Sequence, residues 1–306
     1  MNNKNYKNKK ITRKATEEKD NNETPINWFP GHMTRTKRQI QSSLKLVDAI
    51  VEIIDARIPL SSRNPDLDKL IGSKPRLILM NKCDMADKQQ TQRWIDHYKK
   101  YNVPAIPVDC KTGKGLNLFI PEVKKLLQSK IAVWESKGMV GHSIHVMIVG
   151  IPNVGKSSFI NRMVKKGSAK VENRPGVTRG NQWFTIGKGF ELLDTPGVLW
   201  PKFDDVTVGE HLAFTGAIKQ QILDTEQLAV KLLEILKKDY KSSLAERYKI
   251  NIDDIDDITS YELLERIGKK RGMLVSGGDT DTERTAKMLL DEFRNAKLGC
   301  ITLEKI

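Results

Sequence analysis

The sequence predicts an α/β protein, with a three-layer domain built on a mostly parallel sheet over residues 25–204 and a small all-helical domain over residues 205–306. Short apolar runs alternate with longer amphipathic stretches as far as about residue 203, which is typical of parallel strands joined by helices. Beyond that point the strand-like runs stop and helix start signals recur. A chain of 306 residues is long enough to bury a core in each part.

The elements of the first domain follow from the spacing of its apolar residues. Two stretches, residues 87–101 and 115–130, place apolar residues at helical intervals. Apolar runs with the length of buried strands occur at residues 48–56, 75–82, 105–110, 145–150, 181–187 and 190–195.

The helices of the second domain are indicated by their start signals and by one apolar face. The stretch 226–238 predicts a helix, because Leu228, Leu232, Leu233 and Leu236 share one side. The spacing of a capping box, or a looser version of it, occurs in the pairs Thr259 and Glu262, Thr280 and Glu283, and Asp224 and Gln227.

The net charge of +14 is concentrated in the first two thirds of the chain. Residues 205–306 hold 16 Lys and Arg against 19 Asp and Glu, whereas the remaining residues hold 36 against 19. Such a surplus favours a polyanionic partner, above all nucleic acid. A basic chain that merely stays in solution is the alternative.

Residues 1–24 are rich in Asn and Lys and nearly free of apolar residues, which predicts a disordered basic leader. No apolar segment has the length of a secretory signal core or a membrane span, so we expect a cytoplasmic protein without a membrane partner. An organelle-targeting leader is the alternative. The scattered cysteines Cys83, Cys110 and Cys300 suit a reducing compartment.

The stretch GIPNVGKS (150–157, the phosphate loop) has the pattern G-x-x-x-x-G-K-[ST] between a predicted strand and a predicted helix. Glycines let backbone N–H groups wrap around phosphate oxygens, and the following helix adds its N-terminal dipole. Lys156 is expected to neutralise the β- and γ-phosphates, and Ser157 to ligate Mg²⁺. The nucleotide contacts expected here are Asn153, Val154, Gly155, Lys156, Ser157 and Ser158.

Two downstream stretches complete a phosphate and Mg²⁺ site. In DTPG (194–197), Asp194 at a strand end is expected to hold Mg²⁺ through a water, and the Gly197 N–H to meet the γ-phosphate. In RPGVTRG (174–180), Thr178 is expected to ligate Mg²⁺ only when the γ-phosphate is present, which makes a switch. We therefore count Lys156 and Gly197 among the catalytic groups.

The stretch NKCD (81–84, the guanine loop) has the residues that recognise guanine. Asp84 is expected to accept from the N1 and N2 donors of guanine, which adenine lacks, so we expect GTP to be favoured over ATP. Asn81 is expected to donate to the base edge, and Lys82 to stack its stem over the ring and brace the phosphate loop. The next predicted strand ends in a second base loop, Asp109, Cys110 and Lys111, whose Cys110 N–H is expected to contact O6.

The guanine loop precedes the phosphate loop, whereas in the usual GTPase order it follows it. The observed order results if the usual chain is cut at one point and its former termini are joined. The order is physically allowed, because all these loops emerge at the carboxyl edge of one sheet. Residues 130–143 are long and polar enough to join the former termini. The DTPG loop then leads directly into the helical domain, which gives nucleotide state a route to that domain.

Together these stretches resemble the circularly permuted YlqF/RbgA-type GTPases, from about Ile26 to the C-terminus. The resemblance rests on WFPGHM (28–33), DARIPLSSRNP (55–65), NKCD, GIPNVGKS, RPGVT and DTPGVLWP. It implies a circularly permuted P-loop GTPase that acts in late maturation of the large ribosomal subunit, with rRNA and ribosomal proteins as partners and a C-terminal domain that binds RNA. We expect stimulation of hydrolysis by the ribosomal particle, and a monomer away from it.

Hydrolysis must proceed without the glutamine that often follows the DxxG sequence, because Val198 stands there. His32 resembles the family's proposed water-orienting residue, and Asn153 matches a residue that helps to hold K⁺ in related GTPases. A structural or RNA-contacting role for His32 and a turn-forming role for Asn153 are the alternatives. Without catalysis the chain would be a GTP-sensing module with negligible hydrolysis that acts through a protein partner.

Basic side chains outside these loops are candidate RNA contacts, although a solvated helix face is the alternative for those of residues 282–297. The role of DARIPLSSRNP stays open between bracing the fold and touching RNA. Beside the leader lysines, the candidates are Arg35, Lys37, Arg38, Arg63, Lys269, Lys270, Arg271, Arg284, Lys287, Arg294 and Lys297.

Overall fold

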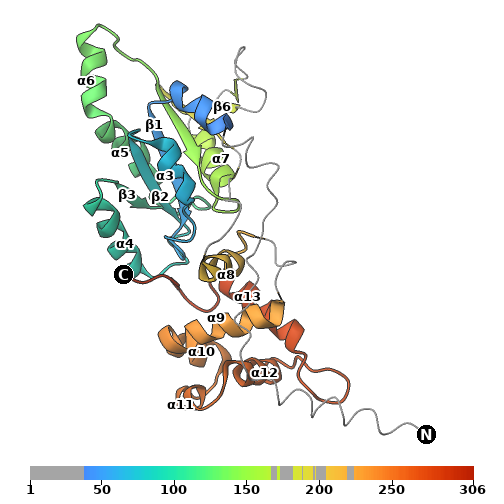
Figure 1. Ribbon diagram of the computed structural model, residues 1–306. Helices are drawn as coiled ribbons and strands as arrows, with labels where there is room; N and C mark the ends of the chain where they lie inside the picture. Colours follow the sequence, from blue (N-terminus) through green and yellow to red (C-terminus); the bar gives the residue numbers. More distant parts are fainter. Residues whose placement is uncertain are drawn as a thin grey trace.

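A seven-stranded sheet in the order β3-β2-β1-β4-β7-β6-β5 forms the centre of the α/β domain (Figure 1). The computed structural model describes residues 38–166, 171–172, 182–187, 189–195, 197, 205–218 and 224–306. The strands are β1 (Ala49–Asp55), β2 (Arg76–Asn81), β3 (Ala105–Pro107), β4 (Ile144–Val149), β5 (Val171–Glu172), β6 (Gln182–Thr185) and β7 (Phe190–Asp194).

The sheet is mostly parallel, as the sequence predicts. Strands β3, β2, β1, β4 and β7 run in one direction, while β6 and β5 are antiparallel to their neighbours. The register places Asp55 beside Asn81 and Ile148 beside Asp194, so these strands end at one edge. Strand β5 was not predicted, because two residues are too few to show a period.

Helices cover both faces of the sheet, which confirms the three layers. Alternate residues of β1 point to opposite faces: Ile53 lies in the cluster that holds Phe119 and Phe159, whereas Ile54 lies in the cluster that holds Trp94. The helices on the first face are α5 (Phe119–Leu126) and α7 (Lys156–Lys166), and those on the second are α3 (Pro65–Ile71) and α4 (Lys88–Lys100).

The join between the former termini is partly helical. The predicted helix over 115–130 is a short 3-10 turn, η2 (Leu116–Leu118), followed by α5 and then α6 (Gln128–Ser136), with a break at Leu127. Helix α6 has no buried residue and no apolar face. Apolar periodicity therefore gave no signal for it.

The C-terminal part consists of helices, and their apolar sides form one continuous cluster with the α5 and α7 face of the sheet. The four leucines predicted to share a face of α9 are all buried. The helices are α8 (Val206–Phe214), α9 (Thr225–Asp239), α10 (Lys241–Tyr248), α11 (Ile252–Asp256), α12 (Ser260–Lys270) and α13 (Thr282–Arg294).

Two of the three predicted helix starts agree with the structure. Thr259 and Glu262 form the capping box of α12, and Asp224 accepts from backbone N–H groups at the start of α9. The third prediction was wrong: α13 is capped by Asp281, not by Thr280. The hydroxyl of Thr280 instead donates to the carbonyl of Glu265 in α12.

The last residues, 300–306 (the C-terminal tail), run back along the α/β domain, and the C-terminus lies beside α4 (Figure 1). The N–H of Ile301 donates to the carbonyl of Met85, and that of Leu303 to the carbonyl of Arg57. Trp94 in α4 donates its indole N–H to the carbonyl of Glu304 at 2.8 Å. The tail, which the sequence assigns to the helical domain, therefore packs on the α/β domain.

In the described part of the chain, every helix is too short or too polar to cross a bilayer.

Candidate functional site

The guanine loop, the second base loop and the phosphate loop meet at the carboxyl edge of the sheet. Each follows a parallel strand: β2, β3 and β4 respectively. The Nδ2 of Asn81 donates to the carbonyl of Val154 at 2.6 Å, and its Oδ1 accepts from the N–H of Cys110 at 2.9 Å. One buried side chain thus ties three loops that lie far apart in the sequence.

These contacts differ from the roles that the sequence gave to Asn81, Lys82 and Cys110. The amide of Asn81 braces the phosphate loop, a task assigned to Lys82, and the Cys110 N–H bonds Asn81 where a bond to O6 of the base was expected. The Nζ of Lys82 donates to Asp55 at 2.9 Å. Asn81 is buried, so an amide without partners would be costly, and the neighbouring backbone groups satisfy it.

The phosphate loop requires its two glycines. Gly150 has a φ of 152° and Gly155 a φ of 105°, a region that disfavours other residues. A Cβ on Gly155 would lie 2.2 Å from the Nδ2 of Asn81, and one on Gly150 would lie 2.5 Å from the carbonyl oxygen of Ile53. Helix α7 begins at Lys156, so its first N–H groups have no partner within the helix and face the loop.

Lys156 and Gly197 lie together at this loop. The Nζ of Lys156 donates to the carbonyls of Gly150 and Ile151 at 3.0 and 2.9 Å. Burial lowers the pKa of Lys156 to about 8, although the charge of Asp194 opposes the shift. A Cβ on Gly197 would lie 2.9 Å from the same Nζ. The DTPG loop therefore approaches the lysine that is expected to meet the phosphates.

Asp194 and Ser157 fit a Mg²⁺ ion. Burial raises the pKa of Asp194, and among the described residues its Oδ1 is a buried carboxylate oxygen without a hydrogen-bond partner. Such an orphaned oxygen suits a ligand of an Mg²⁺ ion or a partner of a water that the ion binds. Ser157 is exposed at the start of α7 and supplies a hydroxyl. The other expected ligand, Thr178, and the expected water-orienting His32 lie outside the described residues, as does Val198.

Asn153 joins the phosphate loop to the helical region. Its φ of 61° is the left-handed conformation that asparagine tolerates better than most residues. Its Nδ2 donates to the carbonyl of Gly216, just after α8, at 2.9 Å. The turn-forming alternative and a K⁺ site both remain compatible with this geometry. Of the other expected contacts in this loop, Val154 is buried and Ser158 is exposed.

The second base loop is closed by its own aspartate. Asp109 accepts from the N–H groups of Lys111 and Thr112 and from the Thr112 hydroxyl. Burial favours a higher pKa for Asp109, but the hydrogen bonds from Thr112 and Lys111 outweigh it and lower the pKa. Asp109 shapes the loop, while Lys111 is exposed. Asp84 is exposed as well.

Several candidate RNA contacts have structural partners. Arg63 pairs with Glu52 and Asp68, and Arg271 lies 3.7 Å from the carboxylate of Glu292. Arg294 donates to the carbonyls at the end of α8. Arg35 and Lys37 lie outside the described residues. Arg271 is exposed, and so are Arg38, Lys269, Lys270, Arg284, Lys287 and Lys297, of which Lys287 also pairs with Glu283.

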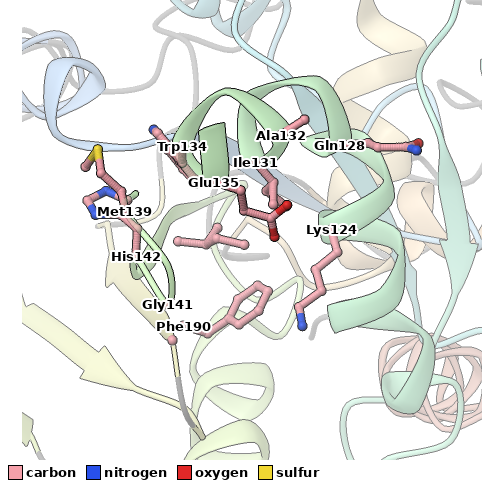
Figure 2. A pocket seen from close by; sticks show the side chains of 12 residues that line it. Lys124, Gln128, Ile131, Ala132, Trp134, Glu135, Met139, Gly141, His142 and Phe190 are labelled. Carbon is pink, nitrogen blue, oxygen red and sulfur yellow. The ribbon is translucent and has the colours of Figure 1, made fainter. Parts of the chain in front are cut away.

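A hollow of about 600 Å³ lies between α5, α6 and the start of β7 (Figure 2). Lys124 from α5, Trp134 and Glu135 from α6, and Phe190 from β7 line it. Because β4 and β7 begin there, the hollow is at the edge of the sheet opposite to the phosphate loop. It is therefore separate from the nucleotide site.

Comparison with known proteins decides which family this site belongs to. Residues 145–268 match the family model described as 50S ribosome-binding GTPase, and residues 72–203 match the model described as RsgA GTPase. The chain is 48% identical over 280 residues to Ribosome biogenesis GTPase A of Priestia megaterium, which covers 91% of this chain and 96% of that relative. The chain belongs to the ribosome biogenesis GTPase A family.

Solved structures of YlqF from Thermotoga maritima have the same fold as this ribosome biogenesis GTPase. The GDP-bound structure of TM YlqF is 28% identical, with a TM-score of 0.63 over 88% of this chain and 99% of that chain. The GNP-bound structure is 27% identical, with a TM-score of 0.62 over 89% and 98%. The predicted circularly permuted P-loop GTPase with a helical C-terminal region is confirmed, and so is a GTP-hydrolysing enzyme of ribosome assembly.

Sequence reasoning missed two groups of residues around this ribosome biogenesis GTPase site. Asp55 and Arg57 lie in a stretch whose role was left open between bracing the fold and touching RNA, and the contact between Asn153 and Gly216 had no signal at all. The available clue to Asp55 and Arg57 was that two charged residues stand at the end of an apolar run. A charge at a buried strand end needs partners.

Proposed function

We propose that this chain acts in late maturation of the large ribosomal subunit, binds the precursor particle in the GTP state and leaves after hydrolysis. The observation that most supports the GTP-dependent part of this cycle is the direct link between the guanine loop and the phosphate loop through Asn81. The positive surplus before residue 205 suits rRNA, and ribosomal proteins complete the expected surface. We place this reaction in the cytoplasm, with the chain as a monomer away from the particle.

The described residues account for binding and charge stabilisation of the triphosphate. Lys156 exchanges its two carbonyl partners for β- and γ-phosphate oxygens, and the Gly197 N–H donates to the γ-phosphate. Ser157 and Asp194, together with Thr178 outside the described residues, would hold Mg²⁺, which would supply positive charge beside the phosphates. Asp84 accepts from guanine, while Asn81 fixes the distance between base and phosphates.

Hydrolysis depends on a water held for attack on the γ-phosphate. The side chain of Val198 has no polar atom to orient this water, so His32 is assigned the role, and intrinsic turnover is expected to be slow without the particle. Asn153 is assigned to K⁺, whose charge would lie beside the developing anion.

The nucleotide state has a short path to the helical region. Helix α8 begins nine residues after Gly197, and the side chain of Asp205 caps it by accepting from the N–H of Thr207. The segment after α8 is bound by Asn153 of the phosphate loop. Movement of the DTPG loop on loss of the γ-phosphate would therefore pull on α8 from one end while the phosphate loop holds the other.

Turnover measured with and without ribosomal particles, in K⁺ and in Na⁺, tests this proposal. We expect stimulation by large-subunit precursors and a faster rate in K⁺. A pull-down with a GTP analogue or GDP should recover the precursor only with the analogue. The alternative, a GTP-sensing module that acts through a protein partner, is favoured by Val198 and predicts tight GTP binding with no stimulated turnover.

A further inference from the structure

The DARIP stretch at residues 55–59 lies next to the nucleotide site, although the proposed function gives it no role. Asp55 is the last residue of β1, the strand between β2 with the guanine loop and β4 with the phosphate loop. Its side chain is only 3% exposed. The carboxylate accepts from the Arg57 backbone N–H, from Nε and Nη2 of Arg57 at 2.9 and 2.8 Å, and from the Nζ of Lys82 at 2.9 Å.

Lys82 needs such a partner, because its backbone has a conformation that lysine disfavours. Its φ is 61°, in the left-handed region, which residues other than glycine, asparagine and aspartate rarely adopt. A residue keeps such a conformation only where its surroundings fix it. Here the N–H of Ala56 holds the carbonyl of Asn81 at 2.8 Å, and the carboxylate of Asp55 holds the side chain of Lys82. Both restraints on the guanine loop come from the end of β1.

The carboxylate of Asp55 is itself fixed in orientation. Arg57 binds both of its oxygens, and a bidentate pair of this kind restricts rotation of the carboxylate. The guanidinium of Arg57 lies over the ring of Phe293 at 5.4 Å and donates to the carbonyl of Arg294 at 3.3 Å. The end of α13 therefore supports Arg57, which orients Asp55, which in turn holds Lys82.

We propose that Asp55 is a positioning residue for guanine recognition, which acts by holding Lys82 and hence the guanine loop in its binding geometry. This inference rests on the proposed guanine site. It assigns to the DARIP stretch a part in nucleotide affinity and base selectivity, rather than in RNA contact. Asp55 does not touch the nucleotide, so its whole effect passes through Lys82.

A purely structural role makes a different prediction. If Asp55 only neutralises the buried guanidinium of Arg57, its loss lowers the stability of the fold and acts on nucleotide binding independently of Lys82. If Asp55 positions Lys82, the two residues form one unit, and their effects on the dissociation constant do not add.

A double-mutant cycle in the full-length protein separates these roles. The dissociation constant of fluorescent GDP and the unfolding temperature are measured for the parent, Asp55→Asn, Lys82→Met and the double variant. We expect each single change to weaken binding by about tenfold, within the range for residues in contact, and the double variant to bind no more than about twofold worse than Lys82→Met. Unchanged binding in Asp55→Asn, or single effects that multiply in the double variant, would overturn the proposal.

Asp48→Asn is the matched control, because it also removes a buried carboxylate that pairs with a cation, Lys130, but just before β1, at the opposite edge of the sheet. It should lower the unfolding temperature and leave the dissociation constant of GDP unchanged. A loss of affinity in Asp48→Asn as large as in Asp55→Asn would show that general destabilisation explains both, which would also overturn the proposal.

If Asp55→Asn does not fold, the cycle is repeated in Asp55→Asn/Arg57→Met, which removes the buried guanidinium together with its partner. In that background Lys82→Met should change GDP affinity by no more than about twofold, whereas in Arg57→Met alone it should still cost about tenfold. An equal cost in both backgrounds contradicts the proposal.

Asp84→Asn distinguishes failure of this inference from failure of the guanine site. An amide at residue 84 can no longer accept both guanine donors, so the preference for GDP over ADP should fall by about a hundredfold or more. If it does not, the guanine site itself is wrongly assigned and the positioning role falls with it. If it does, while the effects of Asp55 and Lys82 multiply, only the role of Asp55 is overturned.

Discussion

The side-chain amide of Asn81 donates to the main-chain carbonyl of Val154 at 2.6 Å, although the two residues are 73 positions apart in the chain. Asn81 ends β2 and Val154 lies in the loop after β4, with β1 between these strands. The contact fixes how far the guanine loop stands from the phosphate loop. That distance must match the span of a guanosine phosphate, so the contact links the order of the strands to the choice of ligand.

Asn81→Asp should weaken binding of GDP by about tenfold to a hundredfold, because it removes a buried donor and places a carboxylate against the carbonyl of Val154. Equilibrium titration with fluorescent GDP measures the effect. Gln92→Ala is the control, since Gln92 makes an exposed amide contact with Asp96 in α4, and its affinity should stay at the parent value. Equal affinities in Asn81→Asp and the parent would remove the bracing role.

Nucleotide affinity should fall as the pH rises through about 8, the pKa to which burial lowers Lys156 in the free protein. Phosphate oxygens favour the charged lysine, so its pKa is higher in the complex and binding takes up a proton above that pH. Below about pH 7 the lysine is charged in both states and affinity is constant with respect to it. Calorimetry of GDP binding in two buffers with different ionisation heats measures the uptake, and a flat profile without uptake contradicts the prediction.

His32→Ala should leave GTP affinity intact and sharply lower the turnover stimulated by ribosomal particles. The reason is that Val198 cannot orient the attacking water, which leaves His32 as the assigned group. Single-turnover hydrolysis with saturating precursor particles measures the step. Equal stimulated rates in variant and parent would return His32 to a structural or RNA-contacting role.

The sheet and its loops could be predicted because they depend on local patterns. Five-residue to seven-residue apolar strands such as β1 and β7 show in the sequence, and parallel strands bring their carboxyl ends to one edge. This placed the guanine and phosphate loops together without knowledge of the strand order. Helix α6 was missed because it has no apolar face, and the cap of α13 because Thr280 bonds Glu265 in another helix.

The partners of polar side chains could not be predicted in the same way. Lys82 and Asp55 lie in different strand-end loops, and the register that brings them together follows from the paired strands, not from either stretch alone. The same holds for Arg63 and Arg294, which composition suggested as RNA contacts but which bind Glu52 and the end of α8. Charge alone does not show whether a basic residue faces solvent or an acidic partner.

The C-terminal tail supports the guanine loop, and Thr302 is the contact that can be removed with the smallest change. Its hydroxyl, fully buried, accepts from the N–H of Asp87 at 3.1 Å, three residues after Asp84. Thr302→Val keeps the shape and leaves that N–H without its partner, which costs about 1–3 kcal/mol of folding stability. Because the lost bond holds the segment that follows Asp84, binding of GDP should weaken as well.

Thr285→Val in α13 is the matched control for this last prediction. Thr285 is also fully buried, and its hydroxyl donates to the carbonyl of Asp281 within the helical region. Both variants should lower the unfolding temperature, whereas only Thr302→Val should raise the dissociation constant of GDP, by about threefold to tenfold for a partly lost loop restraint. If the two variants bind GDP equally well, the tail stabilises the fold without a part in nucleotide binding, and the helical region has one connection fewer to the guanine loop.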